Sequence, residues 1–277
     1  MDDRPLPQAI CPQGNNRRKN MGSYCQVEKS GRLTVVTIDR PEVMNALHPP
    51  GNQELAEVFD DFTQDPEQWV AIITGAGDRA FSAGNDLKYQ ASGGKMGGAA
   101  TGFAGLTQRF DNVKPVIAAV NGLAMGGGFE IALACDLIVA AENAVFALPE
   151  PRVGLAALAG GIHRLPREIG MKQAMGMLLT GRRVSALEGQ SLGFVNEVAP
   201  EGQALSVAKR WAEQILECAP LSVRASKEAA MQGMAADSLE AAITGRYDQI
   251  KAMYKSADFV EGPSAFAEKR APNWTGQ

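Results

Sequence analysis

The feature that most constrains the fold is a series of short apolar runs, each of which ends at a turn. Residues 69–77 read WVAIITGAG, residues 115–125 read PVIAAVNGLAM and residues 136–150 read DLIVAAENAVFALPE. We interpret the first two runs as buried strands and the third as two short strands, with FEIALACD at 129–136 as a short helix. Continuous apolar strands are typical of parallel sheets that are buried on both faces. The pattern therefore predicts an α/β fold built from repeated strand, turn and short-helix units.

The segments around these runs have simpler patterns. Residues 32–41 alternate and are rich in Val, Thr and Ile, which predicts a strand that ends at proline. Apolar residues at helical spacing predict a helix over 51–66. Residues 80–88 are interpreted as a short strand followed by a loop, 91–105 as a flexible glycine-rich loop, and 107–115 as the end of a helix.

From about residue 168 onward the pattern becomes helical. The stretches at 204–220, 221–233 and 238–254 are all amphipathic. Because little sheet remains for their apolar faces to cover, we expect these helices to pack on a partner subunit.

Composition excludes several classes of protein. The 277 residues carry a net charge of -4, so no basic excess indicates a nucleic-acid partner. No apolar stretch reaches about 18 residues without a charge, so we expect no membrane span. Two histidines and no cysteine cluster argue against a metal site. The polar segment 1–23 lacks an apolar signal core and is interpreted as a disordered extension. Reduced thiols in a cytoplasmic protein are the expected state of the four scattered cysteines, Cys11, Cys25, Cys135 and Cys218.

Familiar nucleotide and nucleophile motifs are weak or missing. Gly75 and Gly77 begin a loose G-x-G-x-x-A match after a predicted strand, but a second strand follows where a dinucleotide site needs a helix. The sequence has no G-x-x-x-x-G-K-[ST] phosphate loop and no G-x-S-x-G nucleophile elbow.

Three consecutive glycines precede Phe129 and Glu130 at the start of the predicted helix. Glycine is costly inside a helix, by roughly 1 kcal/mol relative to Ala, so the run needs a reason. Glycines leave backbone N–H groups uncovered at a helix N-terminus, where they can stabilise a developing oxyanion. Close packing of a strand against the helix start would select glycine as well, and the local sequence favours neither explanation.

A second carboxyl group, that of Glu150, lies between two prolines. An exposed turn glutamate is the simpler interpretation of this residue alone. Two glutamates on rigid turns could instead converge on one site and exchange protons with water and substrate. Asn85 lies between small residues on the turn of FSAGNDLK, where its N–H is accessible, and Lys88 places a cation nearby.

Together these stretches resemble the enoyl-CoA hydratase/isomerase (crotonase) superfamily. The resemblance spans roughly residues 26–276 and rests on the order and spacing of six segments, at 39–47, 81–88, 114–150, 154–170, 191–200 and 261–276. It implies a crotonase-like ββα spiral with a C-terminal helical trimerisation region, and a homotrimer or a hexamer formed by two trimers. The chain would then divide into the 1–23 extension, a spiral core over 24–203, and a helical region over 204–277 that supports oligomerisation and completes the active site.

The resemblance also implies an acyl-CoA thioester substrate and no separate cofactor. The backbone N–H groups of Asn85 and Gly127 would hold the thioester oxygen. Glu130 would deprotonate water for attack at Cβ of a trans-2-enoyl-CoA, and Glu150 would supply the proton at Cα. We expect the helix N-terminus to favour ionised Glu130 and burial to favour protonated Glu150. The implied CoA and substrate contacts are Met44, Ala46, Ala83, Asp86, Leu87, Lys88, Gly126, Phe266 and Lys269.

Some positions depart from the pattern of well-studied hydratases. Leu158 stands where those enzymes have a glycine whose N–H helps to hold water, Pro151 replaces an aliphatic residue, and Gly189 replaces the usual alanine. We therefore expect a subgroup with its own acyl specificity, and we interpret 91–105 as the lid of the acyl pocket.

Other functions remain open at this point. Within the superfamily, the chain could isomerise a double bond or couple hydration to carbon–carbon cleavage of an aromatic acyl-CoA. A noncatalytic binding role, as in RNA-binding members, is disfavoured by the two glutamates and the lack of a basic excess. A serine-protease-like site would need Ser82 and His163 to be linked, and nothing in the sequence links them.

Overall fold

The computed structural model describes residues 24–94 and 97–277, whose strands form two sheets. The larger sheet has the order β1 (Cys25–Ser30), β2 (Leu33–Ile38), β3 (Val70–Gly75), β5 (Val116–Val120), β7 (Leu137–Ala141) and β10 (Glu197–Ala199). The smaller sheet has the order β4 (Ala80–Ser82), β6 (Leu123–Met125), β8 (Val145–Ala147) and β9 (Val184–Ser185).

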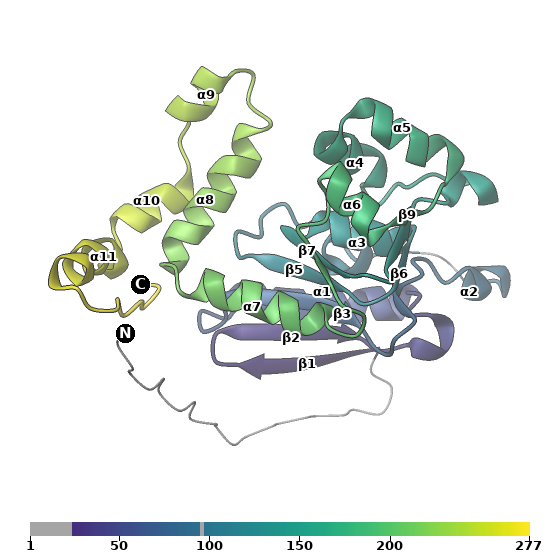
Figure 1. The fold of residues 1–277 in the computed structure, drawn as a ribbon, viewed down its shortest axis with the longest axis horizontal. Coiled ribbons are helices and arrows are strands. Elements are labelled where there is room, and N and C mark those ends of the chain that lie inside the picture. The colour runs from purple at the N-terminus through teal and green to yellow at the C-terminus, as the bar shows by residue number, and fades with distance from the viewer. Residues whose placement is uncertain (1–23, 95–96) are drawn as a thin grey trace, which may run out of the picture.

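The chain alternates between the two sheets. β3, β5 and β7 lie in the larger sheet, and each is followed by a strand of the smaller sheet, β4, β6 and β8 in turn. All neighbouring strands from β2 to β10 in the larger sheet are parallel, while β1 pairs antiparallel to β2. This alternation is the repeated ββα spiral that the resemblance implied, and it confirms the α/β prediction (Figure 1).

The helices cover both sheets. Helices α1 (Pro49–Gln64) to α6 lie within the spiral, with the order α2 (Leu87–Ala91), α3 (Gly127–Ala134), α4 (Gly161–Ile169), α5 (Met171–Thr180) and α6 (Ala186–Leu192). Short 3-10 turns are η1 (Pro41–Val43), η2 (Phe103–Gly105) and η3 (Glu150–Val153). The C-terminal part holds α7 (Ala204–Leu216), α8 (Pro220–Gly233), α9 (Leu239–Thr244), α10 (Asp248–Tyr254) and α11 (Ala257–Glu268).

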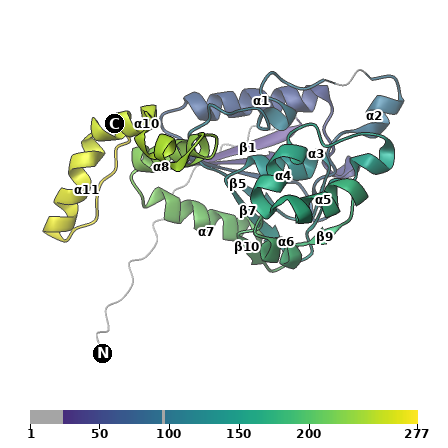
Figure 2. The same ribbon diagram turned by 90° about the horizontal axis from the view of Figure 1, so that it is seen from above.

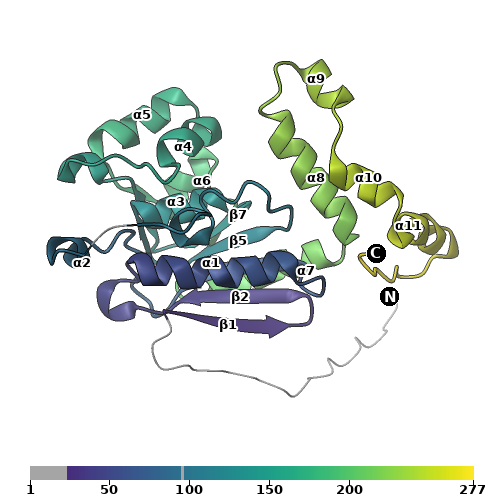
Figure 3. The ribbon, with the colours of Figure 1, turned by 180° about the vertical axis from the view of Figure 1, so that it is seen from behind.

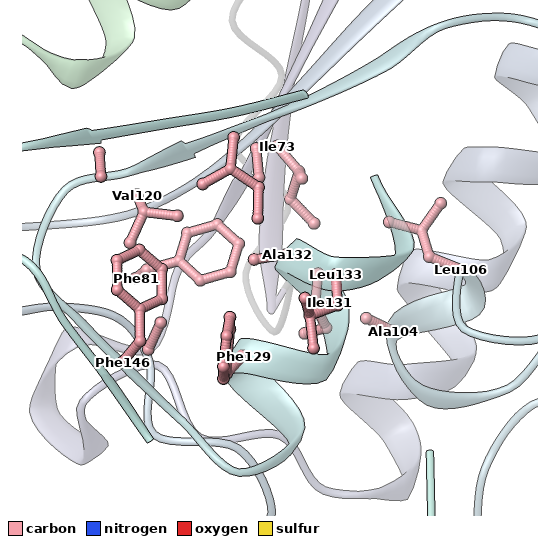
Figure 4. Close-up of a cluster of buried hydrophobic side chains, with 14 of the residues drawn as sticks. Ile73, Phe81, Ala104, Leu106, Val120, Phe129, Ile131, Ala132, Leu133 and Phe146 are labelled. Carbon is pink, nitrogen blue, oxygen red and sulfur yellow. The ribbon is translucent and has the colours of Figure 1, made fainter. Parts of the chain in front are cut away.

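The main core lies beneath α3. Phe129 of α3 packs against Phe146 and Phe194, with ring centroids 5.1 and 5.0 Å apart, and the three rings are buried. Figure 4 shows Phe81 beside Phe146 and Phe129, and Ile131 and Leu133 turned toward Ala104 and Leu106. Complete burial of such side chains stabilises a fold by about 1.5–3 kcal/mol each. The apolar character of α3 therefore fixes the position of the helix that carries Glu130.

Helix α7 corrects one expectation for the C-terminal region. Its alanines at 204, 208 and 212 are buried against the opposite face of the larger sheet, in a second core with Val70, Ile72 and Ile117. This helix therefore covers the larger sheet, although we expected little sheet to remain for the C-terminal helices. Helices α8–α11 extend away from the spiral as an arm, as Figures 1, 2 and 3 show. The chain end is fastened to α11 because the Asp258 carboxylate accepts N–H bonds from Thr275 and Gly276.

Other local expectations also change. Residues 107–115 form turns where we expected the end of a helix. Residues 115–125 form two strands in different sheets, β5 and β6, because Asn121 and Gly122 turn the chain between them. The 91–105 segment contains η2, and its residues 95–96, like the 1–23 extension, lie outside the described residues.

The described residues also bear on metals, membranes and thiols. They contain no cluster of His, Cys, Asp and Glu able to hold a metal ion. None of their helices combines the length and apolar character needed to cross a bilayer. Cys135 and Cys218 are free thiols, the Cys25 thiol donates a hydrogen bond to Glu54, and Cys11 lies outside the described part of the chain.

Candidate active site

The three glycines at the start of α3 are each closely approached by another group. A Cβ on Gly126 would lie 2.8 Å from Glu150 Oε1, and one on Gly127 would lie 2.6 Å from Cε1 of Phe103. A Cβ on Gly128 would lie 2.0 Å from the Ser82 carbonyl oxygen. Close packing therefore selects glycine at these positions. The N–H groups of the first helical turn also have no intrahelical acceptor, and glycine leaves them uncovered.

The turn around Asn85 lies directly against this helix start. A Cβ on Gly84, whose φ is +82°, would lie 2.7 Å from the Gly127 backbone nitrogen. Leu47 and Asn85 form an isolated parallel bridge, in which the Leu47 N–H donates to the Gly84 carbonyl and the Leu47 carbonyl accepts from the Asp86 N–H. In a parallel bridge of this kind the N–H of the intervening Asn85 points to the side away from Leu47. The two amides predicted to hold an oxygen are therefore on adjacent turns.

Glu130 is buried in the first turn of α3, with 3% of its surface exposed. Its Oε1 accepts a 2.8 Å hydrogen bond from the Gly161 N–H. Burial raises the pKa of Glu130 to about 7, and the nearby charge of Glu150 adds to this rise. The bonds from Gly161 and Ala159 and the charge of Arg164 act in the opposite direction. We expected the helix N-terminus to favour the ionised form of Glu130, but its pKa shifts in the opposite direction, because desolvation of the carboxylate outweighs the other effects.

Glu150 begins η3, where Pro149 and Pro151 constrain the backbone. Its Oε1 faces Gly126, and its Oε2 is buried with no hydrogen-bond partner among the described residues. Burial raises the pKa of this carboxyl group, in the expected direction. A protonated carboxyl group with an unpaired oxygen is suited to donate a proton.

The two glutamates and the two amides therefore lie around Gly126 and Gly127. The amides can stabilise negative charge on an oxygen, and water exclusion strengthens that effect. Carboxyl groups with raised pKa values can give and take protons near neutral pH. The local chemistry is thus oxyanion stabilisation combined with proton transfer at two carboxyl groups.

Six of the other predicted contacts lie on one pair of turns near the amides, namely Met44, Ala46, Ala83, Asp86, Leu87 and Lys88. Ala83 N–H donates to the Met44 carbonyl, and Asn45, with a left-handed φ of 55°, donates from its side chain to the carbonyls of Ala76 and Ala80. The bond from Ala83 joins the 44–46 and 83–88 segments, and the Asn45 bonds hold the first of them against the strand that precedes the second. Leu87 and Lys88 are exposed at the start of α2, on the same edge.

Asp86 has a structural role that the sequence did not reveal. Its carboxylate accepts from the Tyr89 N–H as the N-cap of α2 and forms a 3.0 Å ion pair with Arg40. Arg40 also donates to the Ala46 carbonyl at 2.5 Å. The Asp86 carboxylate therefore joins the two turns that present Met44 and Asn85.

Phe266 and Lys269 are not near these groups. They lie at the end of α11, and the views of Figures 1 and 3 place α11 and α2 at opposite ends of the molecule. The Phe266 side chain is 88% exposed. One chain by itself does not bring these two residues to the site.

Sequence reasoning missed Gly161 and Phe103, which contact Glu130 and Gly127. The glycine pair at 160–161 was the available signal, since a Cβ on Gly161 would lie 3.1 Å from Cγ of Glu130. The departure at Leu158 has a visible consequence, because its N–H donates to the Ala156 carbonyl and is engaged within the turn. The amides that face Glu130 come instead from Ala159 and Gly161.

Comparisons with known proteins identify the family of the chain. A family model described as enoyl-CoA hydratase/isomerase matches residues 28–277. The chain is 43% identical to a carnitinyl-CoA dehydratase from Salmonella typhi, over 93% of this chain and all of that protein. It is 39% identical to the solved structure of an enoyl-CoA hydratase from Mycobacterium tuberculosis, with a TM-score of 0.85 over 92% of this chain and 99% of that one. A carnitinyl-CoA hydratase structure from Mycobacterium avium is 40% identical, with a TM-score of 0.74 over 92% and 99% of the two chains.

Proposed function

The chain belongs to the enoyl-CoA hydratase/isomerase family and is a hydro-lyase, and from this premise we propose that it adds water across the 2,3 double bond of a trans-2-enoyl-CoA. The product is a 3-hydroxyacyl-CoA, and the same site catalyses the reverse dehydration. The observation that supports this proposal most strongly is the pair of buried carboxyl groups around the glycine run, Glu130 and Glu150.

In this proposal the amides of Asn85 and Gly127 donate to the thioester oxygen. Withdrawal of electron density through the conjugated system makes Cβ electrophilic, and the amides stabilise the enolate that forms when water adds. Gly84 and Gly127 allow the two turns to approach closely enough for both amides to reach one oxygen.

The two carboxyl groups then carry the protons. Ionised Glu130 takes a proton from a water molecule as the water oxygen attacks Cβ. Protonated Glu150 gives a proton to Cα. A Glu130 pKa of about 7 leaves a large ionised fraction at neutral pH, and burial keeps the Glu150 pKa above its ordinary value. The roles reverse for dehydration, which fits the names of relatives that are dehydratases and hydratases.

Binding of the coenzyme would use the paired turns and a second chain. Met44, Ala46, Ala83 and Gly126 would lie along the substrate, and Lys88 would offer a cation to a phosphate. Because α8–α11 form an arm with exposed apolar side chains such as Met234, Leu239 and Phe259, we propose that the chain assembles as a trimer or a hexamer. Phe266 and Lys269 would then complete the site of a neighbouring chain.

The decisive experiment follows the ultraviolet absorbance of crotonyl-CoA, which is lost when water adds to the conjugated double bond. We expect loss with the wild type and at least about a 100-fold slower loss with Glu150→Gln, since a positioned proton donor contributes at least that much. An exposed glutamate, Glu28, provides a matched control as Glu28→Gln, which should retain the wild-type rate.

Product analysis by chromatography separates the alternatives. A 3-hydroxyacyl-CoA supports the proposal, whereas a shifted double bond or a shortened acyl chain would replace it with isomerase or lyase chemistry. Turnover by Glu150→Gln at the wild-type rate would refute the role given to Glu150.

A further inference from the structure

A cavity of about 450 Å³ lies beside the candidate active site. Its size is that of a small-molecule pocket. It is lined by Thr107, Gln108, Phe110, Leu158, Ala159, Gly160, His163, Arg164 and Arg167.

The walls of the cavity are shared with the site. Leu158, Ala159 and Gly160 lead directly into Gly161, whose N–H holds Glu130. On the opposite wall, Thr107 accepts from the Phe103 N–H through its side-chain oxygen, and the ring of Phe103 covers Gly127. The Arg164 guanidinium ties the two walls by donating to the Thr107 carbonyl at 2.9 Å. A group that extends beyond the reacting carbons on this side therefore meets the cavity.

The cavity combines an apolar rim with basic side chains. Phe110 and Leu158 present apolar surface and are 75% and 74% exposed. His163, Arg164 and Arg167 all project from α4, and the lining contains no carboxylate among the residues that the structure describes. Arg164 is already held by the Thr107 carbonyl, whereas Arg167 bonds with one guanidinium nitrogen to the His163 carbonyl of its own helix.

From this arrangement we infer that the cavity receives the far end of the acyl group and favours an acyl chain that ends in a carboxylate. The apolar rim would contact the methylene groups, and the Arg167 guanidinium would pair with the carboxylate, whose planar geometry it matches. The inference rests on the proposed function, since it assigns the acyl group of that same substrate.

The same arrangement disfavours a quaternary ammonium group, such as the one that a carnitinyl group carries. Such a cation is held by the faces of aromatic rings or by carboxylates. Among the described residues that line the cavity, Phe110 has the only phenyl ring, and the Arg164 guanidinium lies over its face, 5.7 Å from the centroid. A trimethylammonium group would compete with that guanidinium and meet the positive charge of Arg167. We therefore expect this chain to differ in acyl preference from relatives named for carnitinyl-CoA.

The test compares kcat/KM for three trans-2-enoyl-CoA thioesters of similar length. They are the mono-thioester of trans-2-hexenedioic acid, trans-2-hexenoyl-CoA and crotonobetainyl-CoA, which end in a carboxylate, a methyl and a trimethylammonium group. We expect the carboxylate substrate to exceed the methyl substrate by about tenfold or more, because a hydrogen bond to a charged group is worth at least that factor. The trimethylammonium substrate should be the poorest.

Arg167→Gln tests whether the preference arises in this cavity. The variant should lower the carboxylate-to-methyl ratio of kcat/KM to near one, while Lys172→Gln should keep the wild-type ratio, because Lys172 is exposed on the next helix and does not line the cavity. Circular dichroism checks that both variants keep the fold.

The possible failures are distinguishable. Hydration of none of the three thioesters would overturn the proposed function itself. Hydration in which the methyl or trimethylammonium substrate is preferred would leave that function standing and overturn the inference. An unchanged ratio in Arg167→Gln would also overturn it, since the charge that recognises the carboxylate would then lie elsewhere.

Discussion

Replacement of Glu130 by glutamine should abolish most activity and stabilise the fold at the same time. The carboxyl group is 3% exposed, and its pKa rises from 4.5 to about 7 on folding. A raised carboxyl pKa means that the native state holds its proton more tightly than the unfolded state. Stability therefore falls as pH rises from about 4.5 to about 7, and the loss is complete above that range.

The magnitude follows from these two pKa values. One pKa unit corresponds to about 1.4 kcal/mol, so ionised Glu130 costs the folded state about 3 kcal/mol above pH 7. Glutamine carries no charge, and its carbonyl oxygen can still accept the bond from Gly161. Glu130→Gln should thus be more stable than the wild type by about 3 kcal/mol at pH 8, and this advantage should shrink toward zero near pH 4.5.

The assay is urea unfolding of both proteins at several pH values and one fixed protein concentration, because an assembly makes stability depend on concentration. Glu28→Gln serves as the control and should follow the wild type, since the Glu28 side chain is exposed. A stability difference between Glu130→Gln and the wild type that is the same at pH 5 and pH 8 would refute the argument. In parallel, kcat/KM of the wild type should rise as the pH increases toward about 7, because Glu130 must be ionised to accept a proton, and it should fall again at higher pH, where Glu150 loses the proton that it donates.

Two further perturbations test the site and its support. Gly127→Ala keeps its backbone N–H, but the added Cβ and the displaced Phe103 ring should crowd the place where the thioester oxygen meets that N–H, so kcat should fall by about 100-fold, as when an oxyanion donor is out of reach. The fold should stay intact, because the Phe103 ring can turn. Gly128→Ala meets the Ser82 backbone instead and should lower the thermal midpoint far more, so equal midpoints for the two variants would contradict the packing argument. Arg40→Met should destabilise the fold by about 3 kcal/mol in urea unfolding, since it leaves Asp86 buried without its cation. The cost should be smaller when Asp86→Asn is present as well, and an additive double variant would show that the pair is not coupled.

The sequence predicted the parts of the fold that depend on local pattern. The strand runs at 69–77 and 136–150 correspond to β3, β7 and β8, and the helix at 51–66 corresponds to α1. The turn at Asn121–Gly122 was missed inside an apolar run, because β5 and β6 are both buried and continuous hydrophobicity hides a change of sheet. Helix α7 was misjudged because alanines on a helix do not reveal whether a sheet or another chain covers them.

The site residues also differ in whether the sequence alone could reveal them. The glycine run and the two glutamates could be singled out because their residue types are costly in their local settings. Phe103 could not, since its importance lies in a contact with Gly127 that only the three-dimensional arrangement creates. The glycine pair at 160–161 marked Gly161 as unusual, but its bond to Glu130 likewise appears only in the structure. The Glu130 pKa was also out of reach, because burial, amide bonds and two neighbouring charges act on it in opposite directions.

The burial that raises the Glu130 pKa also lowers the stability of the fold, so the function of this carboxyl group has a cost in free energy. Glu130 would be more stable in water, and it is held in the core by the rings around Phe129 and by the bond from Gly161. The apolar packing that positions α3 stabilises the fold, and this stabilisation offsets the free-energy cost of burying the carboxyl group. Stronger hydrogen bonds from the backbone amides would lower the Glu130 pKa and make this carboxylate a weaker base. Deeper burial would keep Glu130 protonated, so that it could not accept a proton. A pKa near 7 lies between these limits, which is where one carboxyl group can take up and release a proton within each catalytic cycle.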